Sequence, residues 1–167
     1  MPILGPPESE LWQGDVFEGV PWSVIRQLDY VQPTGEHGRY LGVPPPPSGG
    51  RGRLVTASGS GLGMLLSHEC VVDKGGMAPL TFARVLPITT YGERGRDAIR
   101  QGANYQTFHI PRVDGVLDES YVDFRLVAAI DPQLLGRFRR IASLTEEGRA
   151  SLRLQMILYW TRLEPAG

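Results

Sequence analysis

Residues 61–90, GLGMLLSHECVVDKGGMAPLTFARVLPITT, contain two short apolar runs separated by a glycine-rich turn. The first run covers 62–66 and leads into 67–70 (Ser-His-Glu-Cys), and the second covers 80–86 and leads into 87–90 (Pro-Ile-Thr-Thr). Short apolar runs bounded by turn residues are typical of neighbouring buried strands. Because each run ends in polar side chains, we expect any functional site of this chain at these strand ends.

The alternation of apolar and polar residues predicts a mainly β protein. It is most regular over 121–130, where every second residue is apolar and Asp123 and Arg125 begin the opposite face. The 21 glycines and 14 prolines cluster between such stretches, which favours short strands joined by turns. We also expect strands over 11–18, 22–31, 53–56 and 105–110. The segments outside the strands are expected to be an N-terminal arm over 1–10, a Pro/Gly-rich loop region over 32–60, a polar loop over 91–104 with a helical turn at 97–101, and a basic connector over 136–141.

One helix is predicted at the C-terminal end, over 145–163. Thr145 is a suitable N-cap, and Glu146 and Glu147 follow in the first turn, where the helix dipole favours acidic groups. Apolar residues then recur at helical spacing on a face wider than one core contact needs. We therefore expect this helix to contact a second copy of the chain or another protein.

Length and composition predict a single domain over 1–167 with a sizeable core, since the chain has 167 residues and 41% hydrophobic content. Its net charge of −1 creates no global attraction for nucleic acid or anionic membranes. Cys70 is the only cysteine, which excludes an intramolecular disulfide and suits a reducing compartment. Without a signal peptide or a membrane-length apolar run, the expected location is cytoplasmic, in a bacterium or a phage-infected cell, with virion association as an alternative.

Several short motifs follow the order found in the PemK/MazF-type toxins. The chain resembles that family, whose members are small SH3-like barrels that cut single-stranded RNA without a metal. The resemblance implies an SH3-like barrel with long loops and one C-terminal helix. The matching segments are Gly14-Asp15-Val16, Met64-Leu65-Leu66-Ser67, Pro87-Ile88-Thr89-Thr90, Phe108-His109-Ile110, Val122-Asp123-Phe124-Arg125 and Leu144-Thr145.

The resemblance also implies a site and a ligand. The catalytic threonine of the family matches Thr89, but the family's strand-borne arginine, which stabilises the transition state, matches Gly61. Arg51 or Arg53 from the preceding loop is the expected replacement, and cleavage is expected to be weak or lost. Thr89 and Thr90 alternatively serve only to satisfy a β-edge. The expected substrate-binding residues are Ser67, His68, Glu69, Thr90 and Arg94.

Two further clusters have a chemical and a structural interpretation. His68, Cys70, Asp73 and His109 are metal-ligand types, but their spacing matches no zinc motif, so we expect no metal and no cofactor. Arginines 137, 139 and 140 around Phe138 have the composition of a nucleic-acid patch, or of a solvated basic face. Arg94, Arg96 and Arg100 join this patch only if the fold brings the segments together.

The sequence therefore supports two hypotheses of function, from different classes. The first is a toxin-like RNA-binding barrel, with single-stranded RNA and an antitoxin as candidate partners. The second is a non-enzymatic assembly or adaptor module, for example a phage structural or head–tail connector protein. The wide apolar helix face makes a homo-oligomer the expected state in either case.

Overall fold

The computed structural model describes residues 3–7, 9–31, 37–40, 51–68 and 78–161. The chain divides into two compact units, one comprising Met1–Val20 with Ser60–Gly167 and the other Pro21–Gly59. Two strands, β2 (Val16–Val31) and β4 (Arg51–Leu65), have residues in both units. The expectation of one domain over 1–167 stays a prediction. No helix of the described ranges combines the length and the apolar character that crossing a membrane requires.

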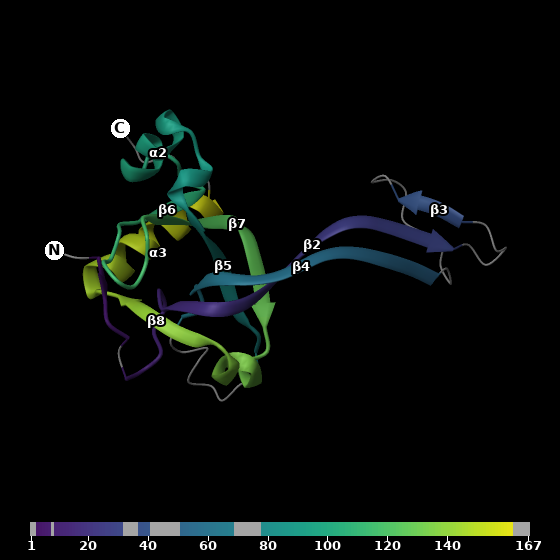
Figure 1. Ribbon diagram of the computed structural model, residues 1–167, viewed down its shortest axis with the longest axis horizontal. Coiled ribbons are helices and arrows are strands. Elements are labelled where there is room, and N and C mark those ends of the chain that lie inside the picture. Colours follow the sequence, from purple (N-terminus) through teal and green to yellow (C-terminus); the bar gives the residue numbers. More distant parts are fainter. Residues whose placement is uncertain (1–2, 8, 32–36, 41–50, 69–77, 162–167) are drawn as a thin grey trace. The chain divides into compact units, whose positions relative to one another are not determined.

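The first unit is a nearly closed antiparallel barrel, which confirms the mainly β fold class (Figure 1). Within the described residues, hydrogen bonding links the strands in the order β1-β8-β2-β4-β5-β7-β6. Besides β2 and β4, the strands of this order are β1 (Leu4–Gly5), β5 (Leu80–Pro87), β6 (Thr107–Ile110), β7 (Ser120–Ile130) and β8 (Arg139–Leu144). The helices are η1 (Ile88–Thr90), α2 (Glu93–Arg100), η2 (Pro132–Arg137) and α3 (Glu146–Thr161).

The two apolar runs of 61–90 form adjacent strands, as predicted. β4 and β5 pair antiparallel, with Leu65 opposite Phe82 and Leu62 opposite Val85. β5 then pairs with β7 on its other side, where the register shifts between Ala83 and Arg84. The interior of the barrel is filled by buried side chains from these three strands, from β2 and β8, and from α3. They include Val16, Met64, Leu65, Phe82, Val85, Val122, Phe124, Leu144 and Leu152.

The segment before β2 is held by Gly14 and Asp15. Gly14 has a φ of 95°, and its N–H donates to the carbonyl of Leu65 at 2.8 Å. The N–H of Leu65 in turn donates to the carbonyl of Asp15 at 2.9 Å. Because a left-handed residue interrupts an extended chain, the predicted strand over 11–18 begins only at Val16, and a turn at 13–14 precedes it.

Residues 16–31 form one strand, which corrects the predicted separation into strands over 11–18 and 22–31. Gly19 has a φ of 88° and lies within this strand. The predicted loop over 32–60 is also wrong in part, since residues 51–60 belong to β4 and 37–40 form β3 (His37–Tyr40). Residues 32–36 and 41–50, which include the proline run, lie outside the described residues.

The second unit contains the remaining parts of β2 and β4 together with β3. β3 pairs antiparallel with β2, with Leu28 opposite Tyr40 and Val31 opposite His37. The hydroxyl groups of Ser23 and Ser58 lie 2.9 Å apart and form a hydrogen bond between β2 and β4.

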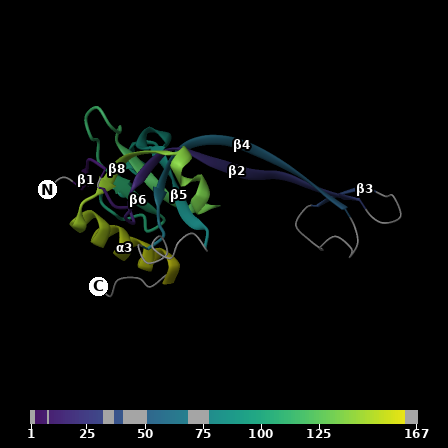
Figure 2. The same cartoon turned by 90° about the horizontal axis from the view of Figure 1, so that it is seen from below.

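Both ends of the described chain are built into the barrel. The predicted arm over 1–10 contains β1, in which Leu4 pairs with Leu144 of β8, so that part of it is a strand. α3 packs against β6 and β8 (Figure 2). The predicted cap is present, because the N–H of Gly148 donates to Oγ1 of Thr145 at 3.3 Å. The helix prediction is confirmed over 146–161, and residues 162–163 lie outside the described part.

Two elements differ from the sequence prediction because tertiary contacts override their polar composition. The segment predicted as a polar loop over 91–104 contains the two-turn helix α2. Its only fully buried side chain is Ile99, which packs with Ile88 and Tyr121. The basic connector over 136–141 overlaps β8, whose arginines pair with acidic residues of the opposite segment.

Candidate nucleic-acid interface

The end of β5 presents Thr89 at the surface. β5 finishes at Pro87, and the single 3₁₀ turn η1 follows directly. Ile88, at 2% exposure, anchors this turn in the barrel, while Thr89 and Thr90 are exposed. The residue that the toxin resemblance singles out is therefore accessible to a ligand.

Thr90 has a structural role in the same turn. Its Oγ1 donates a hydrogen bond to the carbonyl of Pro87 at 2.9 Å, and it lies 3.0 Å from the hydroxyl of Tyr121. Because a threonine hydroxyl has one proton, Tyr121 is the donor of the second bond. Burial raises the pKa of Tyr121, which keeps this phenol protonated. The hydroxyl of Thr90 is thus engaged in holding the turn.

Tyr91, the next residue, contacts two guanidinium groups, one at its main-chain carbonyl and one at its side-chain hydroxyl. Nε of Arg96 on α2 donates to its carbonyl at 3.0 Å, and Nη2 of Arg125 on β7 lies 3.2 Å from its hydroxyl. Its ring packs edge-to-face on Tyr121 with centroids 5.1 Å apart. The exposed turn that carries Thr89 is consequently followed by a residue that contacts two positively charged groups.

Arg125 is held in place by a buried carboxylate. Its Nε and Nη2 donate to the two carboxylate oxygens of Asp123 at 2.9 and 2.7 Å, and Asp123 is 3% exposed. These hydrogen bonds raise the pKa of Arg125, so the group stays charged. Within the described ranges, Nη1 of Arg125 has no hydrogen-bond partner. The arginine is therefore oriented by Asp123 while one end of its fork faces solvent.

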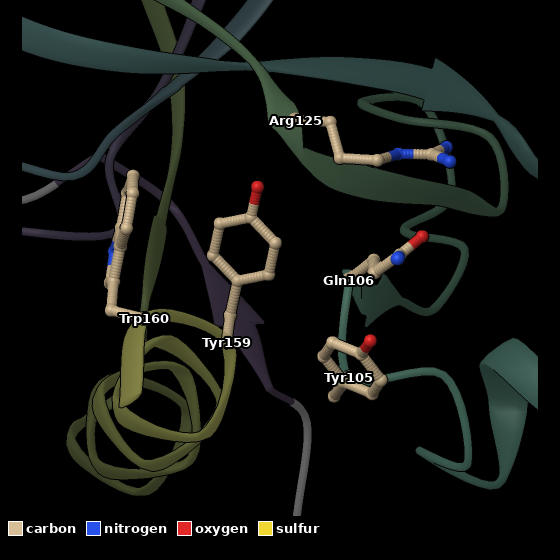
Figure 3. A pocket seen from close by; sticks show the side chains of 5 residues that line it. All are labelled: Tyr105, Gln106, Arg125, Tyr159 and Trp160. Carbon is tan, nitrogen blue, oxygen red and sulfur yellow. The ribbon is translucent and has the colours of Figure 1, made fainter. Parts of the chain in front are cut away.

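A pocket of about 350 Å³ adjoins Arg125 (Figure 3). Tyr105 and Gln106 come from the segment before β6, and Tyr159 and Trp160 come from the last turns of α3. In Figure 3 the ring of Tyr159 lies between those of Trp160 and Tyr105. The pocket thus combines three aromatic side chains, an amide and a guanidinium.

The predicted site residues do not form one cluster. Oγ of Ser67 accepts a hydrogen bond from the N–H of Thr81 at 2.8 Å, at the start of β5, whereas Thr89 follows its end. The eight residues of β5 span about 26 Å. Because β4 and β5 are antiparallel, their C-terminal ends lie at opposite ends of the strand pair. The expectation that these two strand ends share a site is therefore wrong, and Ser67 and the exposed His68 lie away from Thr89.

The other predicted residues fall into two groups. Arg94 is exposed on α2, five positions after the exposed Thr89. Arg51 and Arg53 lie on β4 within the second unit, and their side chains are outside the described part of the chain. Glu69 is also outside the described residues, as are Cys70 and Asp73.

Two of the three arginines around Phe138 pair with carboxylates of this chain, and Arg137 is exposed. Arg139 donates from Nε to Oε2 of Glu18 at 2.8 Å, and Arg140 donates from Nη1 to Oδ2 of the fully buried Asp15, also at 2.8 Å. The Phe138 ring packs on Phe82 with centroids 6.4 Å apart. These contacts favour a structural role over the nucleic-acid patch considered from the sequence.

His109 takes part in an ionic cluster. Its Nε2 lies 3.0 Å from Oε1 of Glu119, whose carboxylate also accepts two hydrogen bonds from Arg100 at 2.8 and 2.7 Å. The Arg100 hydrogen bond, followed by that of His109, lowers the pKa of Glu119 to about 2. Over the residues that the structure describes, no three His, Cys, Asp or Glu side chains gather as metal ligands.

Sequence reasoning missed Arg125, Tyr105, Gln106, Tyr159 and Trp160 as neighbours. Two signals were present in the sequence: an Asp-x-Arg pair on the polar face of 121–130, and aromatic residues on a helix face too wide for one contact. Neither signal indicates that these residues meet, because their positions in the chain are far apart.

No family model, curated protein or solved structure matches this chain.

Proposed function

We propose that this protein is a toxin-like RNA-binding barrel whose ligand is single-stranded RNA and whose cleavage activity is weak or lost. The observation that carries the proposal is the contact of Tyr91 with both Arg96 and Arg125, directly after the turn with the exposed Thr89. Guanidinium groups recognise phosphate oxygens through paired N–H donors. A strand that crosses this turn would meet Arg96 near the main-chain carbonyl of Tyr91 and Nη1 of Arg125 near the hydroxyl of Tyr91.

The same geometry supports weak catalysis. Metal-independent cleavage needs a base, an acid and positive charge at the phosphorane. Thr90 donates its proton to Pro87, and the charge of Arg125 is compensated by Asp123. Thr89 supplies a hydroxyl but is neither a base nor an acid at neutral pH. Binding without efficient turnover is the outcome that these groups favour.

We expect labelled single-stranded RNA to bind, and Arg96→Gln to weaken that binding and to reduce the slope of log K against log salt by about 0.7, the contribution of one phosphate contact. Fluorescence anisotropy at several salt concentrations measures both quantities. Arg112→Gln is the control, because Arg112 is 68% exposed and forms its ion pair with Asp114. An unchanged salt slope in Arg96→Gln would contradict the proposed phosphate contact.

The same preparation, incubated with long single-stranded RNA, is expected to leave it largely intact, with no difference for Thr89→Ala. Fast cleavage that Thr89→Ala abolishes would show that the charge compensation by Asp123 does not limit the reaction.

A second candidate function, an assembly or adaptor module, is favoured by the outer surface of α3. Leu154, Ile157 and Trp160 are 61%, 55% and 60% exposed and follow at three-residue spacing along one side of the helix. Large apolar side chains that gather on a surface are typical of a contact with another protein.

We expect sedimentation equilibrium to detect a species heavier than the 18.4 kDa monomer, since burying these side chains in a self-contact is favourable. Ile157→Asp, which places a charge in the centre of the surface, is expected to restore the monomer. A monomer at every concentration would exclude self-association and leave a different protein as the partner.

A further inference from the structure

The walls of the pocket beside Arg125 are fixed to one another by hydrogen bonds. Gln155 of α3 donates from Nε2 to the carbonyls of Asn104 and Thr107, at 3.1 and 3.2 Å, on either side of the two pocket residues 105 and 106. The N–H of Phe124 on β7 donates to the carbonyl of Gln106 at 3.0 Å. The three segments that line the pocket are therefore held together before any ligand arrives, which lowers the entropic cost of binding.

The aromatic side chains form a supported platform. Tyr159 contacts the buried Phe124 with ring centroids 5.6 Å apart, and it contacts Trp160 with ring centroids 4.9 Å apart and the ring planes at 67°. Trp160 is 60% exposed and Tyr105 is 48% exposed. Part of their aromatic surface is thus available to a planar ligand, while Tyr159 is fixed by the core behind it (Figure 3).

The polar groups restrict the chemistry of the ligand. The residues that line this pocket include no carboxylate, so the three aromatic rings have no counter-charge for an ammonium group. The side-chain amide of Gln106 has no hydrogen bond with a described residue, and Nη1 of Arg125 has none either. Both offer N–H donors at the wall of an aromatic pocket, and Gln106 also offers an acceptor. A flat, uncharged, hydrogen-bonding ring system satisfies all of these groups.

We propose that this pocket holds one unpaired nucleobase of the bound strand, stacked on the exposed aromatic surface of Trp160 and Tyr105 and hydrogen bonded at its edge by Gln106 and Arg125. The inference rests on the proposed RNA-binding function, because Arg125 also borders the Tyr91 turn. A strand whose phosphate lies at that turn can place a neighbouring base in the pocket. The ligand class is then single-stranded RNA with at least one base free of pairing, since a base within a duplex has no exposed face for stacking.

The test compares three oligonucleotides: a single-stranded RNA, the same RNA annealed to its complement, and a series with one abasic nucleotide moved along the strand. Binding is measured by anisotropy, and stacking is measured by quenching of tryptophan fluorescence. The tested variants are Trp160→Leu and Tyr105→Leu, both at exposed positions. Ala150→Ser is the matched control, since Ala150 is exposed on the same helix but does not line the pocket.

We expect single-stranded RNA to quench the fluorescence and the duplex to bind more weakly. Trp160→Leu and Tyr105→Leu are each expected to weaken single-strand binding about 5- to 100-fold, the range found when one base–aromatic stack is removed. One abasic position should weaken binding to the parent but cause no further loss in Trp160→Leu, because the same contact is already absent. Ala150→Ser should bind like the parent.

Two results would overturn the inference in different ways. If RNA binds equally well to the parent and to both pocket variants, and every abasic strand behaves alike, the base pocket is refuted while RNA binding stands. If no RNA binds the parent, the proposed function fails and the base pocket fails with it. Tryptophan quenching by a proline-rich peptide in that second case would assign the aromatic pocket to peptide recognition instead.

Discussion

Replacing Arg140 by leucine is expected to lower the free energy of unfolding by about 3–5 kcal/mol, because it leaves a buried carboxylate without its counter-charge. Asp15 is fully buried, and its Oδ2 accepts hydrogen bonds from the N–H of Trp12 at 3.0 Å and from Arg140 at 2.8 Å. Its Oδ1 has no hydrogen-bond partner in the described part of the chain. Without Arg140, only one backbone donor would remain to compensate the desolvated charge.

Urea unfolding at neutral pH measures this loss, and Arg139→Leu is the control. Arg139 and Glu18 form an ion pair whose side chains are 75% and 52% exposed, and such surface pairs contribute about 0–1 kcal/mol. The double variant Asp15→Asn/Arg140→Leu is expected to be more stable than Arg140→Leu alone, since it removes the uncompensated charge. Equal losses for Arg140→Leu and Arg139→Leu would show that the Asp15 site is open to water.

Gly14→Ala is the second change expected to have a large effect, a loss of about 2–5 kcal/mol. A Cβ at this position would lie 2.5 Å from Cδ1 and 2.9 Å from Cγ of the fully buried Leu144. The backbone φ of 95° adds strain of about 1–2 kcal/mol for any residue with a side chain. Overpacking of the core contributes roughly 1–3 kcal/mol more.

Gly102→Ala separates these two contributions. Gly102 also has a positive φ, of 66°, but a Cβ there meets nothing within 4 Å. Gly102→Ala is therefore expected to lower the free energy of unfolding only by the strain contribution of about 1–2 kcal/mol. If the melting temperatures of Gly14→Ala and Gly102→Ala fall equally, the contact with Leu144 relaxes and the steric argument is refuted.

The strands that could be predicted are those in which one physical signal dominates. The apolar runs over 62–66 and 80–86 and the alternation over 121–130 each indicate burial on at least one face, and all three are strands. The C-terminal helix could be predicted because Thr145 caps it and its apolar residues recur at helical spacing. In each case the information lies within the segment itself.

The elements that could not be predicted depend on partners elsewhere in the chain. The arginines of β8 look like a solvated connector until Arg140 is seen to neutralise Asp15 and Arg139 to pair with Glu18. Residues 57–61 of β4, which are rich in glycine and serine, have little strand propensity and are extended because β4 is the partner of β2 in the sheet. The local sequence pattern does not indicate which distant residues or strands pair.

The residues of the candidate site likewise include some that the local sequence indicates and others that it does not. Thr89 was identified from a local motif and is exposed, whereas the pocket joins residues from before β6, from β7 and from α3. The antiparallel register of β4 and β5 separates Ser67 from Thr89, although both follow apolar runs of similar appearance. Strand direction, which the sequence of either run does not encode, decides which polar residues meet.

The contacts that close the barrel join residues far apart in the chain. Asp15 and Arg140 are 125 positions apart, and Gln13 and Arg153, which hydrogen bond at 2.9 Å, are 140 positions apart. Pairings of this kind raise the contact order, and loop-closure entropy must be overcome before they stabilise the fold. During synthesis on the ribosome, residues 16–18 of β2 emerge long before the β8 segment that pairs with them. This edge of β2 is therefore unpaired throughout that interval, which is when the nascent chain is most exposed to aggregation.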